Sequence, residues 1–288
     1  MTHADSISAP IPGTVQFDFA SDKGSEPHRI FLYTPPGEAP AEGWPVLYLL
    51  DGNAVIATAV EALRAQAPYT LGTGIHFGVV VAIGYPTDEA YDGTRRSWDL
   101  APPPGQSYPP YVEGGPELRT GGADHFLAFI EHELKPEIAR RVPINENRQS
   151  IFGHSFGGLF VLHALFNKPD LFSAWISASP AIWWEGGGII TRAEEFVANP
   201  KGEGRVLLLV GEYEQTLAPF QIGAEDEEKR LAAFLESRIV DYTQEMADRL
   251  APVLATSYVF LPGETHMSVL PACINHAVRF ALGAIHAK

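Results

Sequence analysis

The sequence contains few residues of two kinds, cysteines and basic residues. Cys273 is the one cysteine among 288 residues, so no internal disulfide can form, and no Cys/His cluster has the spacing of a zinc site. Acidic residues outnumber basic residues by 35 to 20, and the resulting formal net charge of −15 argues against nucleic acid or an anionic membrane as a partner. We predict that Cys273 is a small packed side chain in the last helix.

The chain also lacks a long apolar run near its start. Its first sixteen residues hold scattered alanine, isoleucine and proline, so neither a signal peptide nor a membrane anchor can be recognised. We therefore predict a cytoplasmic protein, unless the natural chain begins before Met1. By contrast, 45% of all residues are apolar, which is enough for a sizeable buried core.

Short apolar runs alternate with helical patterns along most of the chain. Strands are expected at residues 15–20, 29–34, 45–50, 78–84, 149–152, 174–177, 205–210 and 257–261. Helices are expected at residues 54–67, 123–141, 156–167, 225–250 and 269–285. This order predicts an α/β fold with a mostly parallel central sheet of about eight strands, flanked by helices on both faces, after two or three antiparallel strands at the N-terminus.

Residues 85–122 interrupt the alternation with seven prolines, repeated glycines and no sustained periodicity. No shift in composition marks a domain boundary, so we predict that residues 1–288 form a single domain. Because the segment follows a strand that ends at Gly84, it is expected at the carboxyl edge of the sheet, where open α/β folds bind ligands. We predict a pocket wall or lid loop there, with an irregular surface linker as the alternative.

Gly153-His-Ser155-Phe-Gly157 is the motif with the clearest chemistry. An apolar run ending at Phe152 leads into it, and a helical pattern follows it. Gly-x-Ser-x-Gly between a strand and a helix is typical of the nucleophile elbow of α/β-hydrolases, where glycines let the backbone turn sharply and expose the serine hydroxyl. We therefore predict Ser155 as the nucleophile. A glycine-rich turn with an incidental serine is the alternative.

A serine hydroxyl needs a base to accept its proton, and in this fold the histidine follows the nucleophile along the chain. His266 fits, because it lies after the last apolar run and just before the last helical pattern. The carboxylate that orients the imidazole is expected after the preceding strand, where Glu212 and Glu214 both occur. We favour Glu214, with Glu212 as the alternative and Asp226 as a third candidate.

Ester hydrolysis also needs two backbone amides that stabilise the oxyanion. One is expected from Phe156, the residue after the nucleophile. The other is expected from the loop after the strand at 45–50, where Asp51-Gly52-Asn53 follows. A glycine there permits a bent backbone, so the donor is predicted to be Gly52 or Asn53. A simple Asp-Gly turn is the alternative.

Longer motifs surround these residues. They are Pro45-Val-Leu-Tyr-Leu-Leu-Asp51-Gly-Asn-Ala-Val55, Val79-Val-Val-Ala-Ile-Gly-Tyr85, the helical run at 126–138, Gly153-His-Ser-Phe-Gly-Gly-Leu-Phe-Val161 and Ser177-Ala-Ser-Pro180. This set resembles the esterases that include the enterobactin and salmochelin trilactone hydrolases, over residues 14–285. The resemblance implies an α/β-hydrolase that cleaves ester bonds by acylating Ser155, with no metal or organic cofactor.

The same resemblance implies substrate-binding residues. Arg96 occupies the position of a family arginine near the substrate and is expected to hold an anionic siderophore, with Arg95 as second choice. A planar guanidinium stacks on catechol rings and pairs with catecholate oxygens. A surface arginine in an acidic protein is the alternative. Trp183 and Trp184 are expected to line an aromatic pocket, or else to pack in the core.

Taken together, the residues predict a serine esterase, and the resemblance implies that its substrate is a siderophore of the catecholate trilactone class. Some siderophore hydrolases look as though they use a serine-histidine pair without a carboxylate, so both a dyad and a triad stay open. Alternatives on the same fold are a general carboxylesterase, an acyl-thioester hydrolase and an acyl transferase. A non-catalytic siderophore-binding module with an idle Ser155 is the alternative of another class. The expected partner is a small ester, and the sequence indicates no oligomeric state.

Overall fold

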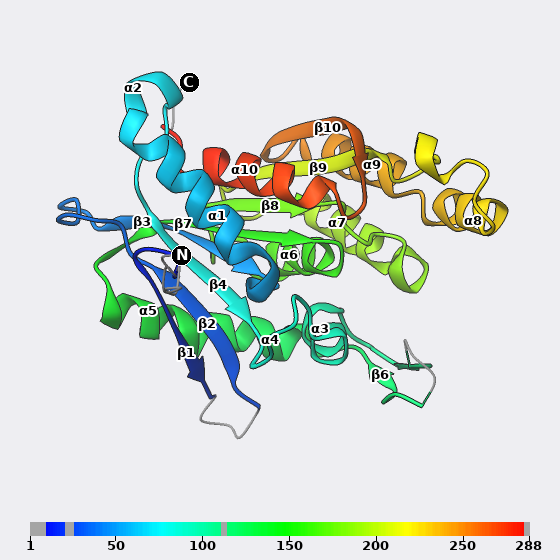
Figure 1. Cartoon of the computed structure of the whole chain (residues 1–288), viewed down its shortest axis with the longest axis horizontal. Coiled ribbons are helices and arrows are strands. Elements are labelled where there is room, and N and C mark those ends of the chain that lie inside the picture. The colour runs from blue at the N-terminus through cyan, green and yellow to red at the C-terminus, as the bar shows by residue number, and fades with distance from the viewer. Residues whose placement is uncertain (1–9, 21–25, 111–113, 285–288) are drawn as a thin grey trace, which may run out of the picture.

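The apolar runs of the sequence form the centre of one mixed sheet. The computed structural model of the chain describes residues 10–20, 26–110 and 114–284, and within them eight strands pair in the order β1-β2-β4-β3-β7-β8-β9-β10 (Figure 1). The pairs from β4 to β10 are parallel, whereas β2 pairs antiparallel with both β1 and β4. The strands are β1 (Thr14–Phe19), β2 (His28–Tyr33), β3 (Trp44–Leu50), β4 (Val79–Gly84), β7 (Ile144–His154), β8 (Ala174–Ala178), β9 (Arg205–Tyr213) and β10 (Ala255–Thr265). The predicted α/β fold is confirmed.

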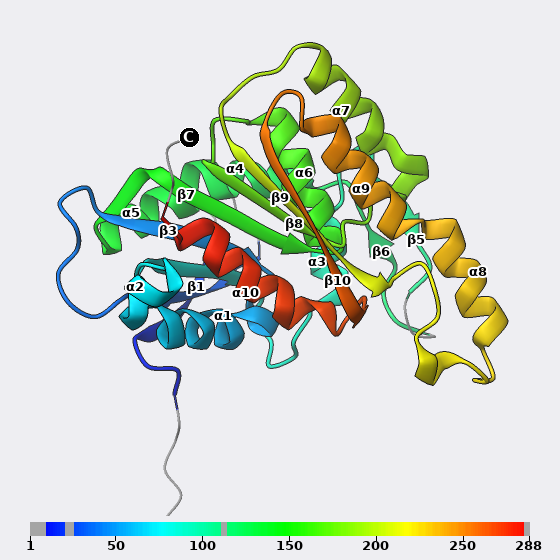
Figure 2. The same ribbon diagram turned by 90° about the horizontal axis from the view of Figure 1, so that it is seen from above.

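Helices cover both faces of the sheet because its central strands are apolar on both sides. They are α1 (Gly52–Gln66), α4 (Ala123–Phe129), α5 (Lys135–Arg141), α6 (Phe156–Asn167), α7 (Gly188–Ala198), α9 (Ile239–Leu250) and α10 (Val269–Leu282). Two further helices, α2 (Thr70–Thr73) and α8 (Glu227–Ser237), bury none of their residues. Leu47 and Leu49 of β3 pack with α1 and α10, whereas Val46 and Tyr48 pack with the layer that contains α4 to α7 and α9. α1 and α10 lie side by side on their face (Figure 1, Figure 2).

The segment at 85–122 is more ordered than the sequence indicates. It contains helix α3 (Gly93–Leu100) and a small antiparallel pair, β5 (Ser107–Tyr108) and β6 (Leu118–Arg119), while residues 111–113 lie outside the described residues. Asp92 caps α3, because its Oδ1 accepts a hydrogen bond from the Arg95 amide at 3.0 Å. These short regular elements were not expected from the sequence, and the role of the segment as a pocket wall or lid loop stays a prediction.

Other boundaries differ from the expected ones. The predicted helix at 225–250 is two helices, α8 and α9, separated by Arg238 in a left-handed conformation with φ 47°. β7 begins five residues before the predicted start at 149, and α7 was not predicted. The expected end of the last helix at Ile285 lies outside the described residues. Cys273 is fully buried in α10, and burial raises the pKa of its thiol.

Over the residues that the structure describes, every helix is too short or too polar to cross a membrane.

Candidate active site

Ser155 occupies a strained turn between β7 and α6. Its backbone has φ 60° and ψ −117°, a conformation that residues with a side chain seldom adopt. Two hydrogen bonds fix the turn: the Ser155 amide donates to Ala178 O at 3.0 Å, and the Ala181 amide donates to Ser155 O at 3.2 Å. The loop after β8 therefore supports the elbow, and the hydroxyl projects from the carboxyl end of the sheet.

Gly153 permits this turn because β7 and α6 approach very closely. A Cβ placed on Gly153 would lie 2.2 Å from the Gly157 carbonyl oxygen, far inside van der Waals contact. The first glycine of the motif is thus required by the close approach of backbone to backbone.

His266 lies within hydrogen-bond distance of the predicted nucleophile. Its Nε2 is 3.0 Å from Ser155 Oγ, and its side chain is 32% exposed. The residue follows β10 directly, as the chain order predicts. A proton held on Nδ1 leaves Nε2 able to accept the hydrogen of the Ser155 hydroxyl.

Glu214 is the carboxylate that reaches the imidazole. Its Oε2 lies 2.5 Å from His266 Nδ1, and its side chain is fully buried. The other oxygen, Oε1, accepts hydrogen bonds from the Ser179 hydroxyl and the Gly211 amide, each at 2.6 Å. The alternative acid, Glu212, instead accepts from the Gly263 amide at 2.7 Å.

Asp226, the third candidate, is the N-cap residue of α8 and pairs with Arg230. The geometry therefore favours Glu214 among the three.

Strand register brings the acid and the base together. The last paired residues of β9 and β10 are Tyr213 and Thr265, so Glu214 and His266 each come next on neighbouring parallel strands. Before that pair, the register shifts between Leu261 and Thr265. This irregularity inserts two extra residues into β10 and aligns the imidazole with the carboxylate.

Both predicted oxyanion donors lie at helix starts. Phe156 is the first residue of α6 and Gly52 is the first residue of α1, where backbone amides have no acceptor within their own helix. Gly52 packs directly on β4, because an added Cβ would lie 2.8 Å from the Ala82 carbonyl carbon. The two helix starts therefore supply amides of the kind that an oxyanion needs.

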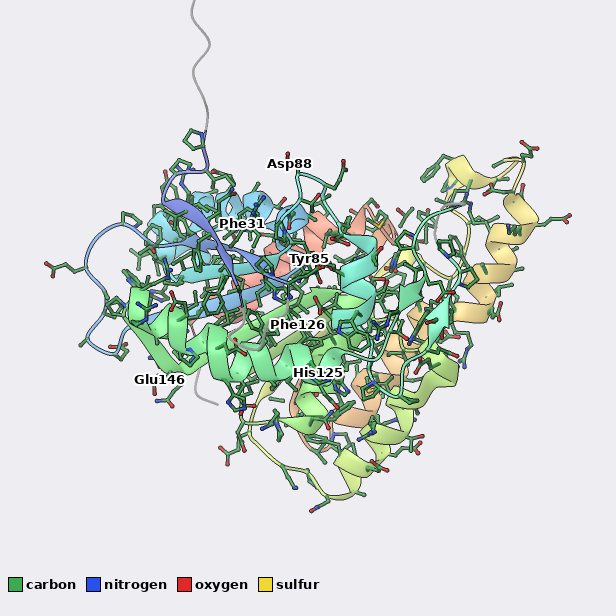
Figure 3. The ribbon with its side chains drawn as sticks, turned by 90° about the horizontal axis from the view of Figure 1, so that it is seen from below. Phe31, Tyr85, Asp88, His125, Phe126 and Glu146 are labelled. Atoms are coloured by element: carbon green, nitrogen blue, oxygen red, sulfur yellow. The ribbon has the colours of Figure 1, made fainter. Side chains whose placement is uncertain are left out.

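The Asn53 side chain has a different task. Its Nδ2 donates to Tyr85 O at 3.1 Å and to Thr87 O at 2.9 Å, and its Oδ1 accepts from the Tyr85 amide at 2.9 Å. Tyr85, labelled in Figure 3, directly follows β4. Asn53 thus anchors the start of the segment at 85–122 to the start of α1.

The structure pairs Arg96 with a protein carboxylate. Its Nε and Nη2 donate to Asp51 Oδ1 and Oδ2 at 2.8 and 2.9 Å. Arg95 donates instead to the carbonyl oxygens of Pro27 and Glu26, at 2.6 and 3.1 Å. Substrate binding by either arginine stays a prediction.

Aromatic side chains gather beside Phe156. The Trp184 ring lies 4.7 Å from the Phe156 ring in an edge-to-face arrangement and 4.8 Å from the Tyr108 ring. Trp183 contacts Trp184 and is 39% exposed. The predicted aromatic pair thus lies next to the residue that follows the nucleophile, and the segment at 85–122 contributes a third ring.

His154 is a neighbour of the site that sequence reasoning missed. Its ring lies 4.6 Å from the His266 ring and the residue is only 5% exposed. Burial lowers its pKa well below 6.5, and the nearby His266 and the positive charge of Arg96 lower it further. A neutral imidazole therefore packs against the candidate base. The motif gives no signal for this contact, because its second position accepts many residues.

Asp51 and Ser179 were also missed. Both have a positive φ, 55° and 45°, and both are buried. Each lies inside a motif of the sequence, Asp51 in the Asp-Gly pair and Ser179 in Ser177-Ala-Ser-Pro180. Membership of these motifs was the one signal that the sequence offered for either residue. Their partners, Arg96 and Glu214, lie 45 and 35 residues away along the chain.

Within the described part of the chain, no group of three or more His, Cys, Asp and Glu side chains could hold a metal ion.

The known proteins to which the chain is similar include esterases. A family model described as "Putative esterase" matches residues 21–255. The chain belongs to this esterase family. It is 38% identical over 280 residues to the ferri-bacillibactin esterase BesA of Bacillus subtilis, covering 94% of this chain and 90% of that protein. It is 34% identical over 293 residues to the siderophore triacetylfusarinine C esterase of Aspergillus fumigatus, covering 93% of each.

Solved structures superpose on nearly the whole chain. The siderophore hydrolase EstA from Aspergillus nidulans superposes with a TM-score of 0.84 at 32% identity, covering 97% of this chain and 98% of that chain. The BES protein from Bacillus cereus superposes with a TM-score of 0.81 at 31% identity, covering 99% and 100%. Both proteins share the arrangement of this esterase over almost their whole length.

Proposed function

We propose that this esterase hydrolyses carboxylic ester bonds of siderophores through an acyl-enzyme on Ser155. The observation that carries the proposal is the continuous contact from Ser155 through His266 to the buried Glu214, with distances of 3.0 and 2.5 Å. A nucleophile, a base and an orienting carboxylate in this order are the parts that acyl transfer requires. A triad therefore fits better than a dyad.

In the first half of the reaction, His266 Nε2 takes the proton of the Ser155 hydroxyl while Oγ attacks the ester carbonyl carbon. The carbonyl oxygen becomes an oxyanion, which the amide of Phe156 and an amide of the Gly52-Asn53 turn stabilise. The imidazolium then gives its proton to the leaving alkoxide, the carbon-oxygen bond breaks, and the alcohol departs.

In the second half, a water molecule gives a proton to His266 and attacks the acyl carbon. The second tetrahedral intermediate collapses, the Ser155 oxygen regains the proton, and the carboxylic acid leaves. Glu214 keeps the imidazole oriented throughout and stabilises its positive charge.

The names of the relatives support a siderophore as the substrate class. The two curated relatives reported above act on ferri-bacillibactin and on triacetylfusarinine C, and each aligns over nine tenths of this chain. We propose a catecholate trilactone as the preferred substrate, since the aromatic rings beside Phe156 offer stacking surfaces for catechols.

Replacing Ser155 by alanine tests the reaction class. We expect Ser155→Ala to lower kcat for p-nitrophenyl acetate by at least about 10⁴-fold, because the covalent route is lost. A fluorophosphonate probe should label the wild-type chain stoichiometrically, and peptide mass spectrometry should place the adduct on Ser155. Ser237→Ala, at the end of the exposed α8, is the matched control. Activity within about tenfold of wild type in Ser155→Ala, or an unlabelled wild type, refutes the nucleophile assignment.

The substrate class needs a separate measurement. Purified protein is offered ferric and iron-free catecholate trilactones, a triacetylated hydroxamate ester siderophore, short aryl esters and a thioester, and products are identified by mass spectrometry. We expect the highest kcat/KM with a trilactone. Equal turnover of simple esters would indicate a general carboxylesterase, and binding without turnover would indicate a binding module.

A further inference from the structure

Asp51 has an unusual backbone conformation at the point where β3 meets α1. Its φ of 55° and ψ of 47° lie in the left-handed region, which residues with a Cβ disfavour. The next residue is Gly52, whose amide is a candidate oxyanion donor. Because a peptide unit is planar, the ψ angle of Asp51 fixes the direction of the Gly52 N–H.

The Asp51 side chain is held in place by Arg96 from α3. The ion pair is bidentate, with distances of 2.8 and 2.9 Å, and the two side chains are 5% and 12% exposed. A bidentate fork restrains both distance and orientation. The segment at 85–122 therefore fixes the conformation of the turn that follows β3.

The same pair also contacts the opposite side of the candidate oxyanion hole. The guanidinium carbon of Arg96 lies 5.7 Å from the centre of the Phe156 ring. A Cβ placed on Gly157 would stand 3.7 Å from Asp51 Oδ2. The ion pair is thus packed between the two backbone segments that supply the amides.

We propose that Asp51 and Arg96 are positioning residues that hold the two oxyanion donors in place, an inference that rests on the proposed function. A role of Arg96 in holding an anionic substrate would require the substrate to compete with the buried Asp51 carboxylate. The two roles differ in their kinetics. If Arg96 binds substrate, replacing it raises KM for anionic esters only. If Arg96 positions the donors, replacing it lowers kcat for every ester, including neutral ones.

The test compares Asp51→Asn, Arg96→Gln and the double variant on the neutral ester p-nitrophenyl acetate. We expect each single variant to lower kcat by about 10 to 100-fold, with KM changed by less than about threefold. This decrease in kcat is smaller than the one caused by removing an oxyanion donor altogether. The kcat of the double variant should lie within about threefold of the kcat of the less active single variant, because the two residues act as a unit. Arg96→Lys keeps the charge but loses the fork, and it should also lower kcat.

A second measurement separates positioning from a general loss of structure. A phenyl trifluoromethyl ketone adds to Ser155 and places an oxyanion in the hole, so its inhibition constant should rise in proportion to the loss of kcat/KM. A purely structural role would lower the melting temperature without this proportionality. Glu61→Gln and Arg64→Gln, an exposed ion pair on α1, are the matched controls and should keep wild-type kinetics.

Arg96→Gln and Arg96→Lys variants that fold and keep kcat for the neutral ester would overturn the inference, even if Asp51→Asn does not fold. So would variants that lose affinity for anionic esters alone. In those outcomes the wild type still hydrolyses esters and labels at Ser155, so the proposed function stands. A wild-type chain that does neither overturns both.

Discussion

At the scale of single residues, the buried Glu214 carboxylate is the best supported group of the site. Three donors reach it: the Ser179 hydroxyl, the Gly211 amide and the His266 imidazole. A buried carboxylate without partners is costly, and these hydrogen bonds offset that cost while they fix its direction. The orientation of the imidazole therefore depends on groups from β8, β9 and β10 together.

Glu214→Gln is expected to lower kcat by about 10² to 10⁴-fold, because an amide fails to hold His266 in the tautomer that accepts the serine proton. Steady-state kinetics with p-nitrophenyl acetate measure the effect. Glu212→Gln provides the comparison, since its carboxylate bonds to the Gly263 amide, and it should stay within about threefold of wild type. A large loss in Glu212→Gln with full activity in Glu214→Gln would reverse the choice of acid.

The sequence was sufficient to predict where Ser155 and His266 lie, because chain order and the elbow motif are local signals. It favoured Glu214 but left Glu212 open as the alternative, because the two stand two residues apart in the same turn. What separates them is the Ser179 hydroxyl, which lies 35 residues from Glu214 along the chain. Such a contact depends on the tertiary structure, and one sequence holds no local sign of it.

At the scale of elements, the crossing of β7 and α6 leaves no room for a side chain at Gly153. We expect Gly153→Ala to lower the free energy of unfolding by roughly 3 kcal/mol or more, because backbone must move against backbone. Urea denaturation measures this change.

The control for that variant is Gly188→Ala at the start of α7, where an added Cβ meets no atom within 4 Å. There we expect a change of less than about 1 kcal/mol, since alanine suits a helix better than glycine. Equal stability of the two variants would show that the crossing of β7 and α6 has room for a methyl group at Gly153.

Element boundaries were predictable where apolar periodicity was strong and failed where it was weak. The helices α1 and α6 and the strands β3, β4 and β8 carry strong apolar patterns, and they lie close to the expected positions. The break at Arg238 between α8 and α9 has no glycine or proline to mark it. Helix α3 is short and polar, and the prolines and glycines around it conceal its pattern.

At the scale of the whole molecule, buried histidines link stability to pH. Burial lowers the pKa values of both His154 and His163 from the ordinary 6.5. Below about pH 6.5 the unfolded chain therefore binds more protons at these positions than the folded chain does. Their contribution is complete above that pH and is lost as the pH falls, with a slope of at most about 1.4 kcal/mol per pH unit for each proton.

We predict that the free energy of unfolding decreases between pH 7 and pH 5, and that His154→Asn makes this decrease shallower. Urea denaturation at several pH values measures both slopes. The control is His132→Asn, whose side chain is 62% exposed in the wild type, and its slope should match the wild type. If His154→Asn keeps the wild-type dependence of the free energy of unfolding on pH, His154 is not a source of that dependence.

The pairing of Thr265 with Tyr213 makes residue number, more than residue type, the constraint on the end of β10. Each residue advances a strand by about 3.3 Å, so regular pairing of every residue from Leu261 to Thr265 would carry the imidazole about 7 Å past the carboxylate, and the register irregularity takes up that length. An exchange such as Pro262→Ala keeps the count intact. Loops at the opposite, amino-terminal edge of the sheet are free of this restriction, and length variation among esterases of this kind is expected to concentrate there.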